Sequence, residues 1–356
     1  MAKRKILFVS KDMGGGNVLV PTAKVMHEEC DVVVVAEGLS VNRWRKAGFE
    51  LYFQGTTDYR DEPFTVDARS ILKRVAPSVV VTGLGSPIHL ENQFGLAAND
   101  ARIPLVWIED FWGGNTRGAA QPELIFTLDH IGVNIVRRNP RFVNTRVEIA
   151  GNLALNALEN IAVPQDLRTR MDELKKPTIL LVGGGASTTS VIEILVKSLR
   201  MTPGDWTLIP RLHPKWTNRK AEGEKTYGEI WNGLLAEFGE RVVEVPTDNA
   251  DAVAMLAAIT VSPFSTLLLP SVVAKNIPIS VRTPEMIQDL KAQTGLERYP
   301  LAEVGAVFEI ERPMPLTAIT IPALLDALRE CQNEYLSEAK PFDSRRVSQE
   351  ILSLVE

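Results

Sequence analysis

The chain has 356 residues, more than a single hydrophobic core usually accommodates, so two domains are expected. Its 45% hydrophobic and 23% charged residues are typical of a globular protein and exclude a disordered or fibrous chain. A net charge of −5 argues against a protein that coats nucleic acid, because that function needs clustered lysine and arginine.

The two cysteines, Cys30 and Cys331, lie far apart without metal-ligand spacing, so we predict buried thiols, no disulfide framework and no metal site. The basic N-terminus leads only into the short apolar run Ile6–Val9, and no apolar run is long enough to cross a membrane. We therefore expect a cytoplasmic protein with no signal peptide and no transmembrane segment.

The first half of the chain alternates predicted strands and helices. Lys5–Ser10 is a short apolar strand, followed by a glycine-rich turn and a helix over Val18–Glu29. Four consecutive valines in Asp31–Ala36 indicate a strand buried on both faces of a parallel sheet. Further helices are predicted at Val41–Ala47, Val66–Val75, Glu91–Asp100 and Asp129–Arg138, and further strands at Glu50–Phe53, Ser78–Thr82, Pro104–Ile108, Glu123–Thr127 and Val147–Ile149.

A second alternating series follows a charged connection at Ile161–Lys176. It consists of predicted strands at Thr178–Val182, Thr207–Pro210, Arg241–Val245 and Thr260–Ser262, and predicted helices at Ser190–Ser198, Ala250–Ala258, Leu267–Ala274, Pro322–Glu338 and Asp343–Val355. The expected fold class is α/β, with two Rossmann-like, doubly wound parallel-sheet domains facing each other across a cleft. We place these domains at residues 1–160 and 177–320, and expect the helices of 321–356 to pack back on the first domain.

Two glycine-rich segments each follow a predicted strand and precede a predicted helix. Glycines there allow a ligand to approach the backbone, and the helix presents unpaired N–H groups to an anion. Neither segment has the GxGxxG or P-loop spacing, and tight turns with ordinary helix caps are the alternative interpretation. We predict an acceptor-binding segment at Gly14, Gly15, Gly16 and Asn17, and a diphosphate-binding segment at Gly183, Gly184, Gly185, Ser187 and Thr188.

Two other segments are predicted to contact the same phosphates. Arg211 and His213 follow a strand at the sheet edge where open α/β sheets bind ligands, although a surface turn shaped by Pro214 is the alternative. Ser265 and Thr266 place two hydroxyls on a turn that enters a helix.

A pair of carboxylates lies among aromatic residues at the end of the strand Pro104–Ile108. Desolvation against rings raises the pKa of a carboxyl toward that of a general acid or base, so Glu109 and Asp110 are the predicted catalytic residues. Side chains alternate along extended chain, so one should face the ligand and the other pair locally; we favour Glu109 slightly for the first role. Trp112 is predicted to stack on the acceptor.

In their order along the chain, these segments resemble the two-domain B-fold glycosyltransferase superfamily, and within it the UDP-N-acetylglucosamine 2-epimerases. The likeness covers most of the chain and is carried by Pro77–Gly83, Ile103–Glu109, Gly151-Asn152, Asn156–Leu158, His213–Lys215 and Ser265-Thr266.

The chain also departs from the epimerase pattern. Leu84 replaces the aspartate of the family's Gly-Asp pair, and Asp110-Phe111 replaces an Ala-Gly pair. Leu269 and Pro270 lie where an acidic residue commonly holds the donor ribose. The resemblance therefore implies a nucleotide-sugar ligand but leaves the identity of the nucleotide open.

Three functions follow from these observations. The first is an inverting, metal-independent, nucleotide-sugar-dependent glycosyltransferase, because a single base is sufficient to deprotonate an acceptor hydroxyl. The second is a 2-epimerase-like enzyme, which needs more than one acid or base. The third is a nucleotide-sugar-binding or scaffold protein without catalysis, because fold alone does not imply activity. The expected partners are a nucleotide-sugar, as substrate rather than cofactor, and an acceptor, with no nucleic acid; no oligomeric state is predicted.

Overall fold

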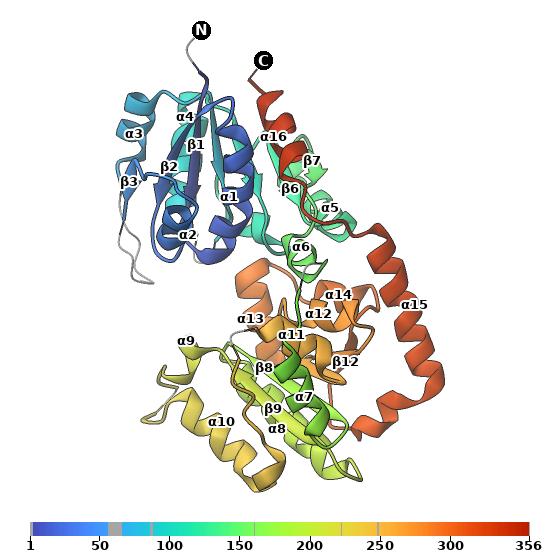
Figure 1. Cartoon of the computed structure of the whole chain (residues 1–356). Coiled ribbons are helices and arrows are strands. Elements are labelled where there is room, and N and C mark those ends of the chain that lie inside the picture. The colour runs from blue at the N-terminus through green and yellow to red at the C-terminus, as the bar shows by residue number, and fades with distance from the viewer. Residues whose placement is uncertain are drawn as a thin grey trace. The chain divides into compact units, whose positions relative to one another are not determined.

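The computed structural model describes residues 3–55, 66–85, 88–159, 161–221, 223–247 and 249–355 (Figure 1). The chain divides into two compact units. Unit 1 comprises Met1–Asn156, Gln293–Gly295 and Glu338–Glu356, and unit 2 comprises Ala157–Ala292 and Leu296–Ser337. Each unit contains one parallel sheet with helices around it, which confirms the predicted α/β fold class.

The sheet of unit 1 has seven strands: β1 (Lys5–Ser10), β2 (Asp31–Ala36), β3 (Phe53–Gln54), β4 (Val79–Thr82), β5 (Leu105–Ile108), β6 (Leu124–Thr127) and β7 (Arg146–Ile149). Their order is β3-β2-β1-β4-β5-β6-β7, and Ile6 on β1 lies opposite Val79 on β4. The chain runs outward from β1 to β3 and then from β4 to β7. The junction between β1 and β4 is thus the topological switch point at which open α/β sheets bind ligands.

Successive residues of β1 are buried on opposite faces of this sheet. Ile6 and Phe8 pack in one hydrophobic cluster, and Leu7 and Val9 pack in the other. The covering helices are α1 (Met13–Met26), α2 (Ser40–Lys46), α3 (Ala68–Val75), α4 (Leu90–Ala101), α5 (His130–Arg138) and the C-terminal α16 (Ser344–Leu352).

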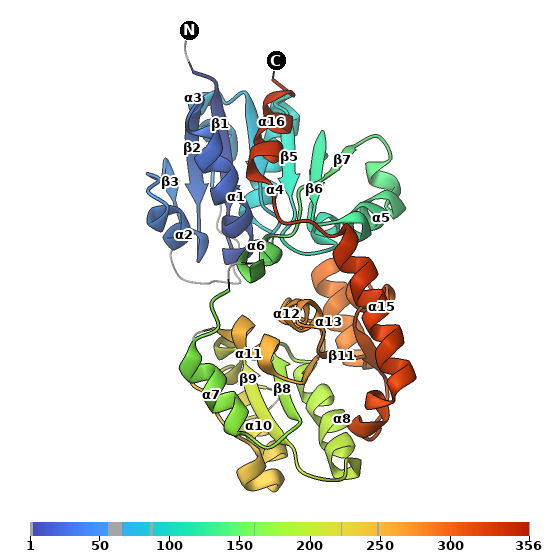
Figure 2. The same cartoon turned by 45° about the vertical axis from the view of Figure 1, so that its right-hand side comes forward.

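The last helix of the chain lies in unit 1, beside the first (Figure 2). Ser348 Oγ on α16 donates to the Thr22 carbonyl on α1 at 3.3 Å, and Val347 and Ile351 belong to the same hydrophobic cluster as Phe8. Burial of this apolar face explains why the helical pattern at the end of the sequence produces a packed helix.

Unit 2 has five parallel strands: β8 (Thr178–Gly183), β9 (Thr207–Leu212), β10 (Ile259–Ser262), β11 (Ile277–Val281) and β12 (Phe308–Ile310). Their order is β12-β11-β10-β8-β9, so the switch point lies between β8 and β10 and β12 is an edge strand. Its helices are α7 (Gln165–Glu173), α8 (Thr188–Met201), α9 (Pro214–Thr217), α10 (Tyr227–Leu235), α11 (Ala250–Leu256), α12 (Leu268–Val273), α13 (Pro284–Thr294), α14 (Pro300–Glu303) and α15 (Pro322–Glu338), and α6 (Leu153–Glu159) precedes them.

One predicted strand of unit 2 is wrong. Arg241–Val245 is not a strand, because a 3₁₀ helix over Ala236–Arg241 precedes it and only one isolated bridge, between Val242 and Leu208, joins it to the sheet. The helix α7 was not predicted; it lies within the segment 161–176, and its Leu167 and Met171 are buried in the core of unit 2. The strands β11 and β12 were not predicted.

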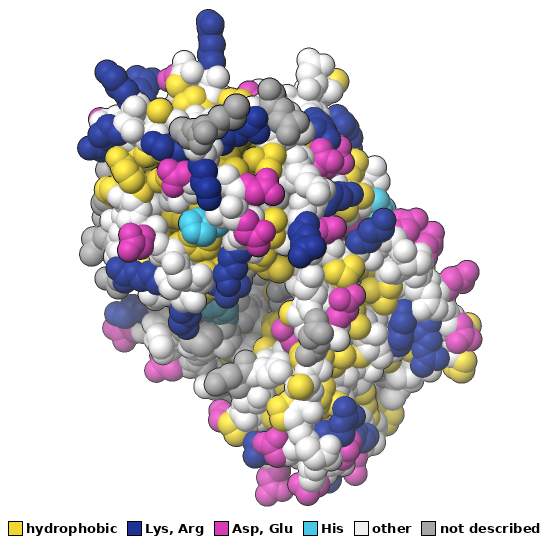
Figure 3. All heavy atoms as spheres, turned by 45° about the horizontal axis from the view of Figure 1, so that its top comes forward, with side chains coloured by type: hydrophobic (Ala, Val, Ile, Leu, Met, Phe, Trp, Pro, Cys, Tyr) yellow, Lys and Arg dark blue, Asp and Glu magenta, His cyan; other side chains and the backbone are white. Residues whose placement is uncertain are grey.

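On the face shown in Figure 3, basic and acidic side chains alternate over the surface. No helix among the described residues is long and apolar enough to cross a membrane.

Candidate functional site

Carboxyl groups from three strand ends gather at the switch point of unit 1. Asp12 follows β1, Glu91 lies in the first turn of α4 after β4, and Glu109 and Asp110 follow β5. The Asp12 charge acts on both Glu91 and Asp110, and Asp110 in turn acts on Glu109. We call these four residues the acidic cluster. Its position is the place where an open parallel sheet offers a binding site.

The segment predicted as a glycine-rich loop is the first turn of α1. Asp12 is its N-cap, and Asp12 Oδ1 accepts the Gly15 N–H at 2.8 Å. A Cβ at Gly14 would lie 1.7 Å from Asp110 Oδ2, and a Cβ at Gly83 would lie 2.6 Å from Gly15 Cα. These glycines are therefore needed for close packing of protein atoms, and Gly14 lets the Asp110 carboxylate approach the helix start.

The other residues predicted to contact an acceptor differ in accessibility. Gly16 is buried against Ser40, and Asn17 is half-buried on α1. Trp112 is 2% exposed, and its indole Nε1 donates to Asp129 Oδ1 at 2.9 Å. The Trp112 ring is therefore part of the core of unit 1 and cannot stack on a sugar.

Glu109 is buried and is held by local bonds. Its Oε1 accepts both the backbone N–H and the side-chain Nδ2 of Asn115, each at 2.8 Å. Burial raises the pKa of Glu109 to about 7, although the two bonds from Asn115 and the nearby Arg117 charge lower it. Its Oε2 is buried without a partner among the described residues.

Asp110 is half-buried and lies against Gly14. Burial, and then the negative charge of Asp12, raise the pKa of Asp110 to about 7, against an opposing contribution from Arg117. Its Oδ1 has no hydrogen-bond partner in the described part of the chain. Asp110 is thus the less constrained carboxylate of the pair.

Glu91 was not predicted as a site residue. It is 1% exposed; its Oε1 accepts the Lys11 N–H at 2.8 Å, while its Oε2 is a buried oxygen with no described partner. Burial, and then the charge of Asp12, raise the pKa of Glu91 to about 8. In the sequence Glu91 is only an acidic residue in the first turn of a helix, where such residues are common, so nothing marked it as buried.

In unit 2, the glycine-rich turn after β8 already has partners within the chain. The N–H groups of Gly184 and Gly185 donate to Thr188 Oγ1 at 3.0 and 3.2 Å. The Ser187 N–H donates to Asp289 Oδ2 at 2.9 Å. A phosphate at this helix start would therefore lie beside a carboxylate unless Asp289 moves.

The cationic residues lie at the end of the neighbouring strand. The His213 N–H donates to the Gly183 carbonyl at 2.7 Å, and His213 is exposed. Arg211 Nη1 donates to the Thr247 carbonyl at 2.9 Å. The side chains of Pro214 and Lys215 lie outside the described part of the structure.

The hydroxyl turn follows β10, on the other side of the switch point. Ser265 Oγ accepts the Leu267 N–H at 3.1 Å, and the Ser265 carbonyl accepts the Tyr299 hydroxyl at 2.9 Å. Thr266 is exposed. The predicted phosphate-binding residues of unit 2 thus lie at the ends of three adjacent strands, β9, β8 and β10.

No protein-family model matches the chain, and no curated protein is similar to it in sequence. Solved structures are similar over nearly the whole chain. S. aureus MnaA in complex with UDP has 14% identity and a TM-score of 0.69, with 99% of this chain and 97% of that chain covered. A UDP-GlcNAc 2-epimerase from Neisseria meningitidis bound to UDP-GlcNAc has 12% identity and a TM-score of 0.59, with 99% of each chain covered. MurG from Acinetobacter baumannii has 16% identity and a TM-score of 0.58, with 98% of this chain and 99% of that chain covered.

These similarities confirm the fold inferred from the sequence. The protein has the two-domain α/β architecture shared by UDP-GlcNAc 2-epimerases and MurG. Identities of this size establish the fold and leave activity to be argued from the site.

Among the described residues, no group of three or more His, Cys, Asp or Glu side chains could hold a metal ion.

Proposed function

We propose that the protein is a nucleotide-sugar-dependent glycosyltransferase, inverting and metal-independent, with Asp110 as the base that deprotonates the acceptor. The observation that carries the proposal is the Asp110 carboxylate at the switch point of unit 1. It is half-buried, and its Oδ1 has no hydrogen-bond partner among the residues that the structure describes. A pKa of about 7 for Asp110 suits proton transfer near neutral pH. Glu109 is the weaker candidate for the base, because Asn115 occupies its Oε1.

The fold supports a nucleotide-sugar as the ligand, because relatives of this architecture are bound to UDP or UDP-GlcNAc. In unit 2, Arg211, His213 and the Ser265-Thr266 turn are the proposed contacts to the diphosphate. Cationic side chains and hydroxyl donors there would stabilise the leaving phosphate without a metal ion.

A second function, 2-epimerisation, is favoured by one specific observation. Epimerisation needs at least two acid or base groups. Glu91 supplies a second buried carboxyl beside Asp12, and its Oε2 has no partner in the described part of the chain. Glu91 could supply the carboxyl group that is missing at Leu84, which replaces the aspartate of the epimerase Gly-Asp pair.

Incubation of the purified protein with a panel of nucleotide-sugars, followed by mass spectrometry and NMR of the products, distinguishes these functions. Released nucleotide with unchanged remaining donor supports transfer or its hydrolytic side reaction. An isomerised sugar supports epimerisation. Binding without turnover, for every donor and with cell-extract acceptors added, refutes both enzymatic proposals in favour of the binding protein.

Conservative variants identify the base. Asp110→Asn should lower kcat about 10²-fold or more, the usual contribution of a positioned base, and leave nucleotide affinity nearly unchanged. Glu109→Gln is the matched control and should lower kcat less. If Glu109→Gln lowers kcat more than Asp110→Asn does, Glu109 is the base. The wild-type rate should rise with pH through about 7, as the Asp110 pKa requires, and should persist in the presence of a chelator.

A further inference from the structure

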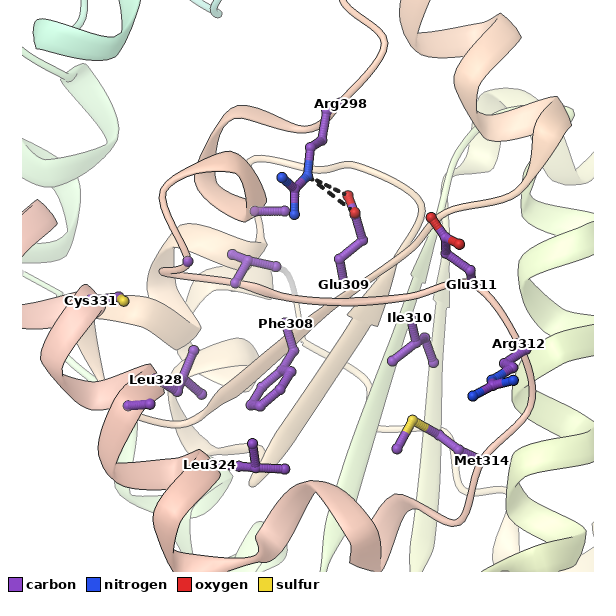
Figure 4. A pocket seen from close by; sticks show the side chains of 14 residues that line it. Arg298, Phe308, Glu309, Ile310, Glu311, Arg312, Met314, Leu324, Leu328 and Cys331 are labelled. Atoms are coloured by element: carbon purple, nitrogen blue, oxygen red, sulfur yellow. Dashed lines mark hydrogen bonds and ion pairs between the residues drawn. The ribbon is translucent and has the colours of Figure 1, made fainter.

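A groove in unit 2 lies along an unpaired strand edge. Its volume is about 740 Å³ (Figure 4). Its walls come from β12, from the segments before and after β12, the first of which includes α14, and from one face of α15. The groove shares no residue with the predicted phosphate-binding residues of unit 2.

The groove follows the open edge of β12 rather than one face of the sheet. Its lining contains Phe308 and Ile310, and also Glu309 and Glu311. Successive side chains of a strand point to opposite faces, so a cavity that contacts both pairs must cross the strand edge.

The backbone of β12 offers hydrogen-bonding groups at this edge. The Ile310 carbonyl accepts the N–H of Arg282, the residue after β11. The backbone N–H and carbonyl of Ile310 therefore point toward β11. Successive backbone groups alternate in direction, so the N–H and carbonyl of Glu309 face the groove. Such an edge can pair with an added strand.

The opposite wall is an apolar stripe on α15. Leu324, Ala327, Leu328 and Cys331 have the i, i+3, i+4, i+7 spacing that places side chains on one helix face. Leu324 is 40% exposed, and in Figure 4 Leu324, Leu328 and Phe308 point into the same space. The stripe and Phe308 provide an apolar contact surface for alternate side chains of a strand.

Two of the arginines at the rim form ion pairs, and a third has no ion-pair partner among the described residues. Arg298 Nε binds Glu309 Oε1 at 3.1 Å, and Arg282 Nη1 binds Glu311 Oε1 at 2.6 Å. Arg312 is exposed at the end of β12 and makes no ion pair with a described residue. A segment that enters the groove would meet an uncompensated positive charge there.

We propose that this groove binds an extended segment of a partner protein, which adds a strand to β12. Its apolar side chains, at alternate positions, contact Leu324, Leu328 and Phe308, and an acidic side chain pairs with Arg312. A second copy of this chain fits poorly, because its own β12 is bordered by its own α15, which would lie between the two edges.

The direct test is fluorescence polarisation with labelled hexapeptides capped at both ends, patterned polar, apolar, polar, apolar, polar, acidic. Wild-type protein should bind members of this library saturably. Two sets of peptides are N-methylated, one at the odd and one at the even backbone positions. The set whose methyl groups face β12 should not bind, because strand addition needs those N–H groups, and the other set should still bind. Absence of binding across the library, or equal binding of the two N-methylated sets, overturns the proposal.

Variants separate backbone pairing from charge. Glu309→Pro removes the edge N–H and should weaken binding about tenfold, whereas Glu309→Ala keeps this donor and should bind more tightly than the proline variant. Arg312→Glu should weaken binding about fivefold, and a peptide with lysine in place of its acidic residue should restore it. Equal affinities of Glu309→Pro and Glu309→Ala would refute strand addition.

Variants of α15 test the apolar wall of the groove, and a measurement of self-association tests whether a second copy binds there. Leu324→Arg places a charge in the groove and should reduce affinity at least tenfold, while Glu330→Arg, on α15 outside the groove lining, is the matched control. Thermal melts verify that each variant is folded. Peptide binding that competes with concentration-dependent self-association would assign the groove to a second copy instead.

Discussion

Unit 1 should lose stability as the pH rises, because the buried Glu91 ionises, and replacement of Glu91 by glutamine should remove this part of the loss. Burial raises the pKa of Glu91 from its ordinary value of 4.5 to about 8. A carboxyl with a raised pKa stabilises the folded state fully below its unfolded pKa, and this contribution is lost as pH rises through the folded pKa. The wild type should therefore become less stable between these two values, and Glu91→Gln should not show that part of the loss.

The magnitude follows from linkage. Each pH unit between the two pKa values costs the folded state about 1.4 kcal/mol, so from about pH 5 to about pH 8 the wild type should lose on the order of 3 kcal/mol more than Glu91→Gln. Glutamine keeps the oxygen that accepts the Lys11 N–H, so the change removes the ionisation and preserves that bond.

Urea unfolding at several pH values measures this difference. Cys30 is 4% exposed in unit 1, so a short thiol-labelling pulse at one fixed pH, read by peptide mass spectrometry of the Cys30 peptide, reports on the unfolding of unit 1. Glu50→Gln, at an exposed position of unit 1, is the control. If the free-energy difference between wild type and Glu91→Gln is the same at about pH 5 and about pH 8, the reasoning about this buried carboxyl is wrong.

Three further substitutions test the two sites. Gly14→Ala should lower kcat on the order of 10²-fold, measured in the donor-turnover assay, because its methyl group would lie 1.7 Å from Asp110 Oδ2 and displace that carboxylate. Asp289→Asn should raise nucleoside-diphosphate affinity about two- to fivefold by calorimetry, because it removes a negative charge from the Ser187 N–H; weaker binding would make Asp289 a support of the turn. His213→Ala should weaken that affinity about tenfold to a hundredfold with little change in melting temperature, because the exposed imidazole supports no core; unchanged affinity for every nucleotide would remove His213 from the site.

Local sequence patterns were sufficient to predict most of the fold. The apolar run at Lys5–Ser10 is β1 with the same bounds, and the helical spacing at Pro322–Glu338 is α15 with the same bounds. Central parallel strands are buried on both faces, so continuous apolar runs identify them without knowledge of their neighbours. The position of Glu109 and Asp110 after β5 could likewise be predicted, because it follows from where that run ends.

Only the tertiary structure decided what surrounds those residues. The sequence indicated glycines at positions 14–16, but the approach of Asp110 to Gly14 arises from a distant strand end that only folding brings there. Glu91 and Asp289 could not be predicted as site residues, because burial of the first and the bond of the second to Ser187 arise from contacts between segments far apart in the chain. Local sequence sets which backbone conformations are favourable, whereas the desolvation and charge pairing of a side chain depend on neighbours that only folding brings together.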